Sequence, residues 1–318
     1  MENINRRFEG LFVPHVTPFD DSGAVDLGSL ERLTAHLVSR RGVSGLVSCA
    51  RIGEGPVLTN EEKRSVYRIA GDVARQAGRI HIAAISPQST QEAIALLREL
   101  EHLPVDAVMI FPPLLFAWGK VDGELKVCFF KDLAAASEMP LVLFQVPVAS
   151  YWYDLETICR IAEIDRVVAF KEASFNWDLF TDTVRRLSQR GARMQILTGN
   201  DRFVAESYRL GAKGALIGVS NLATEKWSAM DEAGRAGDYG RAMVFQEELS
   251  ELKELVFSEP IVEAVSRIKT ILQHEGLIES AVVRKPQLGV SREEQSRLIR
   301  IYGSIAPNLA AQTRRFAG

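Results

Sequence analysis

A lysine ends an apolar run in the sequence VVAFKEASFNWD, residues 167–178. Burial removes solvent from an ammonium and lowers its pKa, so lysine is rarely buried without a reason. A free amine at Lys171 would be able to attack a ketone, and the resulting iminium would withdraw electrons for carbon–carbon cleavage, carbon–carbon formation or dehydration. A lysine paired with a neighbouring carboxylate such as Glu172 fits the position equally well.

Strand-like and helix-like segments alternate around this lysine. The predicted strands cover residues 11–16, 43–49, 80–85, 106–111, 140–146, 167–171, 193–198 and 214–219. The predicted helices cover residues 27–40, 59–77, 89–103, 125–137, 155–164, 177–189, 201–211 and 223–236. Continuous apolar strands between amphipathic helices are typical of parallel strands covered on both faces.

Eight strand–helix units predict an α/β fold, a (β/α)8 TIM barrel. A doubly wound sheet is the alternative, but it usually has a glycine-rich turn after the first strand, and here that strand ends in HVTPF. We expect residues 1–237 to form the catalytic barrel and residues 238–318 to form a C-terminal helical region packed on it.

Catalytic groups of such barrels lie at the C-terminal ends of the strands and in the loops that follow. That rule selects His15 and Thr17; Arg51, Gly53 and Glu54; Pro112 and Pro113; Phe144, Gln145 and Pro147; Lys171 and Glu172; Gly199, Asn200 and Asp201; Gly218 and Ser220.

Composition excludes several other classes of protein. The formal net charge of −3, without a basic tract, argues against nucleic acid as a partner. Three scattered cysteines argue against a disulfide scaffold, and without CxxC or HExxH spacing we expect no metal site. The polar first residues and the absence of a long apolar run predict a cytoplasmic protein without membrane attachment.

Six motifs occur together in a familiar order: GLFVPHVTPFDDSGAVD, GEGPVLTNEEK, PLVLFQVP, VVAFKEAS, ILTGND and GAKGALIGVSN. In this order and spacing the chain resembles the dihydrodipicolinate synthase / N-acetylneuraminate lyase family, over residues 10–294. The resemblance implies a (β/α)8 barrel with a C-terminal helical region, often a homotetramer. It also implies a lysine, matched by Lys171, that forms an imine with pyruvate or another 2-oxo acid without any cofactor.

The resemblance also implies binding residues. Gly53 and Glu54 match the end of a loop that binds the carboxylate of the 2-oxo acid. We assign Phe144, Gly199 and Leu216, at or near the ends of their strands, to the same pocket. Arg51 would be able to bind a carboxylate in a bidentate manner, or it is an exposed loop arginine.

Several positions depart from the family pattern. Phe144 stands where the family usually has a tyrosine that relays protons, and phenylalanine has no hydroxyl. Arg51 and Ile52 replace two hydroxyl residues, Phe175 replaces a small residue, and the arginine that dihydrodipicolinate synthases carry after NVP is missing. These departures predict a substrate other than that of a dihydrodipicolinate synthase.

Four residues are candidates to replace the missing proton relay. Tyr151 and Tyr153 follow the fifth strand closely, although packing is the more common role of such loop aromatics. His15 and Glu54 are the other two, and a core role is the safer expectation for His15. Glu172 should point to the opposite side of its strand from Lys171 and act structurally.

Two questions stay open in the sequence. The apolar segment at residues 111–120 suits the substrate pocket, a contact between subunits of a dimer or tetramer, or local packing equally. The chain is either a Schiff-base aldolase or dehydratase, or a non-catalytic member that binds a 2-oxo acid or regulates. An unrelated barrel enzyme is much less favoured.

Overall fold

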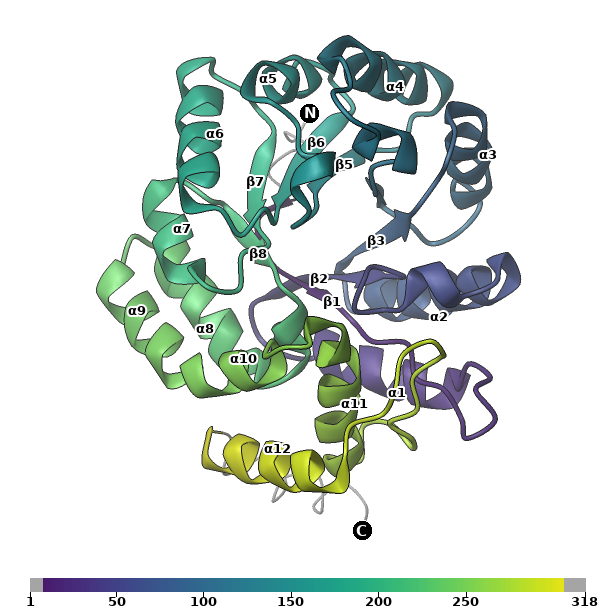
Figure 1. Ribbon diagram of the computed structural model, residues 1–318, viewed down its shortest axis with the longest axis vertical. Coiled ribbons are helices and arrows are strands. Elements are labelled where there is room, and N and C mark those ends of the chain that lie inside the picture. The colour runs from purple at the N-terminus through teal and green to yellow at the C-terminus, as the bar shows by residue number, and fades with distance from the viewer. Residues whose placement is uncertain (1–7, 306–318) are drawn as a thin grey trace.

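Eight strands close into a barrel in the computed structural model, which describes residues 8–305 (Figure 1). Each strand pairs in parallel with the next one in the chain, and β1 pairs with β8, so the sheet has no open edge. The predicted (β/α)8 barrel is confirmed, and the doubly wound alternative is excluded because its sheet would remain open.

The strands lie close to their predicted positions. They are β1 (Gly10–Pro14), β2 (Val43–Ser48), β3 (Ile80–Ile85), β4 (Ala107–Ile110), β5 (Leu141–Gln145), β6 (Val167–Glu172), β7 (Gln195–Thr198) and β8 (Gly214–Leu216). The seventh strand begins two residues later than predicted, because its ladder with β6 starts at Gln195 opposite Ala169. The eighth is shorter, because the chain turns into the 3-10 helix η5 (Gly218–Asn221).

Helices follow every strand and surround the barrel (Figure 1). They are α1 (Leu27–Val38), α2 (Asn60–Gln76), α3 (Thr90–Leu100), α4 (Gly123–Ala136), α5 (Leu155–Ala162), α6 (Trp177–Gln189), α7 (Val204–Leu210) and α8 (Thr224–Arg235). Thr59 forms the predicted cap of α2: its hydroxyl accepts a hydrogen bond from the Glu62 N–H, and the Glu62 carboxylate accepts one from the Thr59 N–H.

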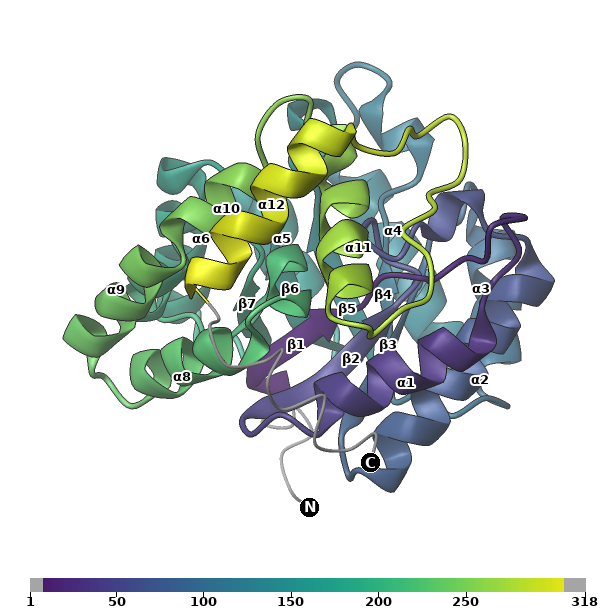
Figure 2. The ribbon, with the colours of Figure 1, turned by 90° about the horizontal axis from the view of Figure 1, so that it is seen from below.

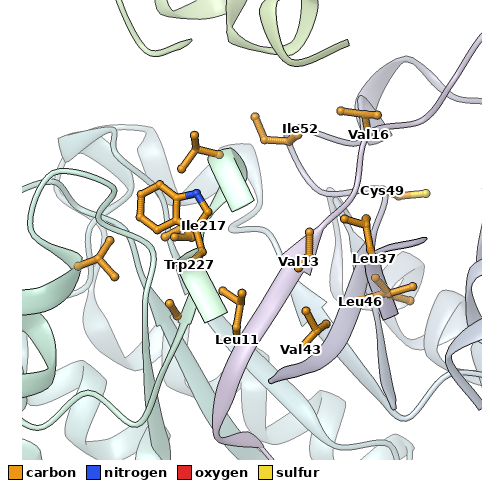
Figure 3. Close-up of a cluster of buried hydrophobic side chains, with 14 of the residues drawn as sticks. Leu11, Val13, Val16, Leu37, Val43, Leu46, Cys49, Ile52, Ile217 and Trp227 are labelled. Atoms are coloured by element: carbon orange, nitrogen blue, oxygen red, sulfur yellow. The ribbon is translucent and has the colours of Figure 1, made fainter. Parts of the chain in front are cut away.

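Two hydrophobic layers follow from the alternation of side chains along the strands. The inner layer fills the barrel and includes Phe12, Val47 and Leu216. The outer layer joins strands to helices, and Figure 3 shows Leu11 and Val13 of β1 packed between Leu37 of α1 and Trp227 of α8. On β6, Phe170 belongs to the outer layer, so the next residue, Lys171, faces the barrel interior.

The C-terminal region is helical as far as residue 305. It contains α9 (Tyr239–Glu248), α10 (Ser250–Val256), η6 (Ile261–Glu263), α11 (Ala264–His274) and α12 (Arg292–Ile305). Helix α12 lies against α10 and α11, as Figure 2 shows, and α9 packs on α7 and α8. Arg267 of α11 is almost fully buried and donates hydrogen bonds to the carboxylates of Glu294 in α12 and Glu263 in η6, so it links these three elements.

Where the barrel domain ends stays a prediction, and residues 306–318 of the predicted C-terminal region lie outside the described part of the chain. Within residues 8–305, no helix has both the length and the apolar character required to cross a membrane.

Candidate active site

Lys171 occupies the C-terminal end of β6 inside the barrel. Only 9% of the residue is exposed. Burial lowers the pKa of the Lys171 ammonium to about 8, Asp201 partly opposes that effect, and Arg51 adds to it. A lysine with this pKa is partly a free amine near neutral pH, which is the form required of a nucleophile.

Aromatic rings form one wall of the space around Lys171. Its Nζ atom lies 4.4 Å from the centroid of the Phe144 ring. The Phe111 ring packs edge-on against Phe144, with the ring centroids 4.8 Å apart. This wall is apolar, so it desolvates the amine but contains no hydroxyl that would exchange a proton with it.

A glycine is required on the neighbouring strand end. A Cβ atom added to Gly199 would lie 2.7 Å from the Ala173 Cβ atom and 3.0 Å from the Lys171 Cε atom. Contacts that short do not occur between carbon atoms without displacement. Gly199 therefore makes room for the lysine side chain rather than offering a functional group.

The Glu172 carboxylate faces away from Lys171, as predicted, and is occupied by other partners. It accepts hydrogen bonds from Asn200 Nδ2, Gln145 Nε2 and the Ser174 N–H. Asn200 also donates to the Glu172 carbonyl and accepts from the Phe175 N–H. This buried network joins the ends of β5, β6 and β7, and the alternative of a Lys171–Glu172 ion pair is wrong.

Asp201 follows β7 and is the acidic group that interacts electrostatically with Lys171. Its residue is 5% exposed, and its Oδ1 atom has no hydrogen-bond partner among residues 8–305. Burial raises the pKa of the Asp201 carboxyl to about 7, against the opposing effect of Lys171. The sequence had placed Asp201 only among the strand-end residues; its buried, unpaired oxygen became visible only in the fold.

Arg51 lies at the exposed rim of the barrel on the loop after β2. Its Nη2 atom donates to the Ile261 carbonyl, 3.1 Å away, and its charge interacts with Asp201. The arginine is therefore neither remote from the site nor free in solvent. It connects the β2 loop to η6 of the C-terminal region.

A cavity of about 260 Å³ opens beside these groups. Asp201 lines it together with the apolar residues Phe175, Phe257 and Ile261 and the charged residues Arg202, Lys253 and Glu254. Phe175 has a left-handed backbone, with φ of 56°, held by the hydrogen bond from its N–H to Asn200. The cavity is large enough for a small organic acid.

The loop that contains Gly53 and Glu54 is fixed from two sides. Thr17 Oγ1 donates to the Gly53 carbonyl, 2.7 Å away. The Glu54 carboxylate forms a fully buried ion pair with Lys269 of α11 and accepts a hydrogen bond from the Arg284 N–H. Its side chain is therefore engaged with the C-terminal region and is not directed at Lys171 as a proton relay. Leu216 lies fully buried in the inner layer of the barrel.

The other relay candidates are not brought to Lys171 either. Tyr153 packs in the outer layer against Phe116 and Phe130 of the β4–α4 region, and burial raises the pKa of its phenol. Tyr151, half-buried, packs against the same outer layer.

His15 belongs to a buried hydrogen-bonded chain. Its Nε2 atom bonds to Ser48 Oγ, and Ser48 Oγ bonds to Nε2 of His81, each at 2.7 Å. Burial lowers the pKa of both imidazoles to about 4. His15 is therefore a buried, hydrogen-bonded residue, which is consistent with the core role that we expected for it. Among residues 8–305, no group of three or more His, Cys, Asp or Glu side chains is placed to hold a metal ion.

Sequence and structure comparisons agree on one family. Residues 7–303 match the model of the dihydrodipicolinate synthetase family. The chain belongs to this family. A 4-hydroxy-tetrahydrodipicolinate synthase from Moorella thermoacetica is 34% identical over 286 residues, which cover 89% of this chain and 93% of the relative. One from Sphingopyxis alaskensis is 34% identical over 82% of this chain and 88% of the relative.

Solved structures of the dihydrodipicolinate synthetase family have the same fold. The dihydrodipicolinate synthase from Aquifex aeolicus superposes with a TM-score of 0.84 at 26% identity, covering 95% of this chain and 99% of that one. The enzyme from Bacillus anthracis gives a TM-score of 0.83 at 28% identity, covering 93% and 98% of the two chains. The family resemblance seen in the motifs is thus confirmed, and the chain is a relative of lyases.

Proposed function

We propose that this protein is a Schiff-base lyase that acts on pyruvate or another 2-oxo acid through Lys171. The main observation behind this proposal is a buried lysine with a lowered pKa at the C-terminal end of a barrel strand. The carboxylate that interacts with it, Asp201, lines a cavity. Perturbed pKa values in clefts are typical of functional sites. Family membership supports the proposal further.

The chemistry follows from the groups of this site. The free amine of Lys171 attacks the ketone carbon, and loss of water leaves an iminium between Nζ and that carbon. The iminium draws electrons from the adjacent carbon, so a proton or a carbon substituent is released there. Arg51, at the rim and linked to η6, is the group that we propose for the substrate carboxylate.

We further propose that the substrate differs from that of the named relatives. Phe144 presents a ring without a hydroxyl to Lys171, and Val148 to Ser150, which follow the FQVP sequence, contain no arginine. Both changes alter how protons move and how a second substrate would bind. Aldol cleavage or condensation and dehydration are the two reaction types that this lysine would support.

A catalytically inactive member that binds a 2-oxo acid is the second candidate, favoured by the missing hydroxyl at Phe144. One experiment separates the two. The protein is incubated with pyruvate and a panel of other 2-oxo acids in the presence of borohydride, and its mass is measured intact and after peptide mapping. We expect a reduced adduct on Lys171 that Lys171→Ala abolishes and that a matched exposed variant, Lys213→Ala, retains.

Each outcome of that experiment is informative. An adduct accompanied by turnover supports the lyase, and an adduct without turnover supports the inactive binder. The absence of any adduct across the panel, or its location on another buried lysine, Lys126 or Lys269, would contradict the proposal.

We also propose that the protein forms a homo-oligomer. The 3-10 helices η3 (Leu114–Ala117) and η4 (Ala149–Tyr151) lie side by side at the barrel rim. Four apolar residues there are exposed, namely Leu114 (49%), Leu115 (51%), Trp118 (72%) and Val148 (48%). Apolar surface of this kind is typical of protein contacts. The fold alone does not fix the assembly, because a structural neighbour with a TM-score of 0.86 and 23% identity is described as a monomeric dihydrodipicolinate synthase variant.

Different residues of the segment 111–120 suit different roles among those that its sequence left open, namely local packing and a subunit contact. Phe116 is buried against Phe129 and Tyr153, whereas its exposed neighbours support the subunit contact. The free thiols of Cys49, Cys128 and Cys159 support the cytoplasmic location that we propose with this function.

A further inference from the structure

We propose that Asp201 is the catalytic acid and base of this site, moving the protons that imine and enamine formation at Lys171 require. This inference rests on the proposed function. It starts from a chemical need: the ketone oxygen must leave as water, and a proton must leave the carbon next to the iminium. Both transfers need a titratable group close to the Lys171 nitrogen.

The surroundings of Lys171 contain few groups that would do this. The ring of Phe144 lies 4.4 Å from its ammonium, measured to the ring centroid, and carries no exchangeable proton. Glu172 is held on the other side of β6 by Asn200, Gln145 and Ser174. The two charged groups that act on Lys171 are Asp201 and Arg51, and a guanidinium stays protonated.

Asp201 has a free oxygen in the right region. Its Oδ1 atom is buried and has no hydrogen-bond partner within residues 8–305, which is costly for a polar atom unless something else compensates. Gly199, two residues earlier, lies so near the Lys171 side chain that an added Cβ atom would be 3.0 Å from Lys171 Cε, so the same strand end brings Gly199 and Asp201 to this region. Asp201 also lines the cavity of about 260 Å³, together with Phe175 and Arg202.

The charges that face Asp201 come from three separate elements. Lys171 extends from β6, Arg51 from the β2 loop and Lys253 from α10. The backbone N–H groups of Asp201 itself and of Val219 also favour its carboxylate. Against these, burial favours the neutral acid and leaves the pKa of Asp201 at about 7, so both protonation states are accessible near neutral pH.

Asp201 transfers a proton in two successive steps of this reaction. Lys171 Nζ adds to the ketone carbon, and the ammonium proton passes to the oxygen to give a carbinolamine. The Asp201 acid protonates the departing hydroxyl, water leaves, and an iminium and an aspartate carboxylate remain. That carboxylate then removes a proton from the adjacent carbon, the C–H electron pair becomes the carbon–carbon double bond of the enamine, and the iminium π pair moves to nitrogen.

Exchange of the methyl protons of pyruvate for solvent deuterium tests this step without a second substrate. With the wild-type protein, proton NMR should show loss of the methyl signal that depends on Lys171. Asp201→Asn keeps the size of the side chain and removes its acid–base function, so we expect exchange to slow by roughly 10²-fold or more. Asp201→Glu should recover part of the rate, and Asp178→Asn, an exposed aspartate on α6, should stay within about twofold of wild type.

A purely electrostatic effect of Asp201 on Lys171 has a different signature. In that case Asp201→Asn, which removes the carboxylate that raises the pKa of Lys171, would move borohydride trapping of the imine to lower pH, and exchange near neutral pH would be at least as fast as in the wild type. Exchange in Asp201→Asn at or above the wild-type rate would overturn the proposal.

Folding and function are checked separately. Circular dichroism shows whether each variant is folded. If neither Asp201 variant folds, the wild-type protein decides: as the pH is lowered through about 7, exchange should fall more steeply than borohydride trapping, which follows Lys171 alone, and an exchange rate that only follows the trapping rate would overturn the role of Asp201. If wild-type protein forms no imine with any 2-oxo acid, the proposed lyase function itself fails, which is a distinct result.

Discussion

Lys171 Nζ lies 4.4 Å from the centroid of the Phe144 ring, so the ammonium form of the lysine is stabilised by the ring face. Phe144→Leu keeps an apolar wall but removes this attraction, and the pKa of Lys171 should fall below its value of about 8. A desolvated cation–π contact contributes about 2 kcal/mol, so we expect the pKa of Lys171 to fall by about 1.5.

The initial rate of borohydride trapping with pyruvate, measured from pH 5 to 10, reports this shift. Only the free amine reacts, so the rate rises with pH through the pKa of Lys171, and the midpoint should move to lower pH in Phe144→Leu. Phe129→Leu, in the outer layer, should leave the midpoint unchanged. A midpoint that stays or moves upward in Phe144→Leu would contradict the cation–π assignment.

Gly199→Ala should impair imine formation. The new Cβ atom would approach the Ala173 Cβ atom to 2.7 Å and the Lys171 Cε atom to 3.0 Å, so the lysine must move. A misplacement of about 1 Å at a reacting group costs roughly 10²-fold in rate, and trapping kinetics measure it. Gly289→Ala is the matched control, since its added Cβ atom has no neighbour within 4 Å. Equal trapping rates in the two variants would show that Lys171 does not depend on Gly199.

Breaking the Glu54–Lys269 pair by changing one partner should destabilise the fold, whereas replacing both partners with uncharged residues should not. Burial raises the pKa of Glu54 and lowers that of Lys269 to about 8, so desolvation opposes both charges. Glu54→Gln leaves the Lys269 ammonium buried and unpaired and should cost about 3–5 kcal/mol of unfolding free energy. The double variant Glu54→Gln/Lys269→Met should recover most of that loss.

Urea unfolding measures each member of this cycle. Glu248→Gln provides the comparison, because its partner Lys226 is part of an exposed pair whose loss should cost less than about 1 kcal/mol. A double variant that is less stable than either single variant would show that the charges themselves stabilise the fold.

Asn200→Ala should destabilise the ends of β5, β6 and β7 together. It removes two donors to Glu172 and the acceptor of the Phe175 N–H. Hydrogen bonds to charged groups contribute about 1.5–3 kcal/mol, so a loss of at least about 2 kcal/mol is expected from thermal or urea unfolding. Gln76→Ala, exposed at the end of α2, should change stability by no more than about 0.5 kcal/mol. An Asn200 variant as stable as that control would rule out the network as a stabilising element.

Leu115→Ser/Trp118→Ser should dissociate the proposed oligomer. Both side chains are more than half exposed on the β4–α4 loop, and polar replacements remove the apolar contact area. Sedimentation velocity of the wild type should show a species heavier than one chain, and the variant should shift toward the monomer. Leu288→Ser, 70% exposed elsewhere, should not change the distribution. A monomeric wild type, or an unchanged variant, would refute this contact.

The fold was largely determined by patterns that are local in the sequence. Continuous apolar runs for the strands and helical apolar spacing for the helices, with caps such as Thr59 before Glu62, indicate where elements begin and which face they bury. Element ends were less predictable: the helix expected from residue 201 begins at Val204, without a side-chain cap, because residues 199–203 form the loop of the site.

Lys171 was identified by its place after an apolar strand, and alternation along β6 correctly set Glu172 on the other side. Three features of the site were not predictable in this way: the buried, unpaired oxygen of Asp201, the ion pair of the Glu54 carboxylate and the outer-layer position of Tyr153. Each depends on side chains far apart in the sequence. Local spacing contains no information on such contacts: Glu54 meets Lys269 only because the C-terminal helices fold back over the barrel rim. The sequence by itself therefore determined the barrel and its lysine, whereas the tertiary structure decided which groups surround that lysine, since burial and long-range packing set their charges and their partners.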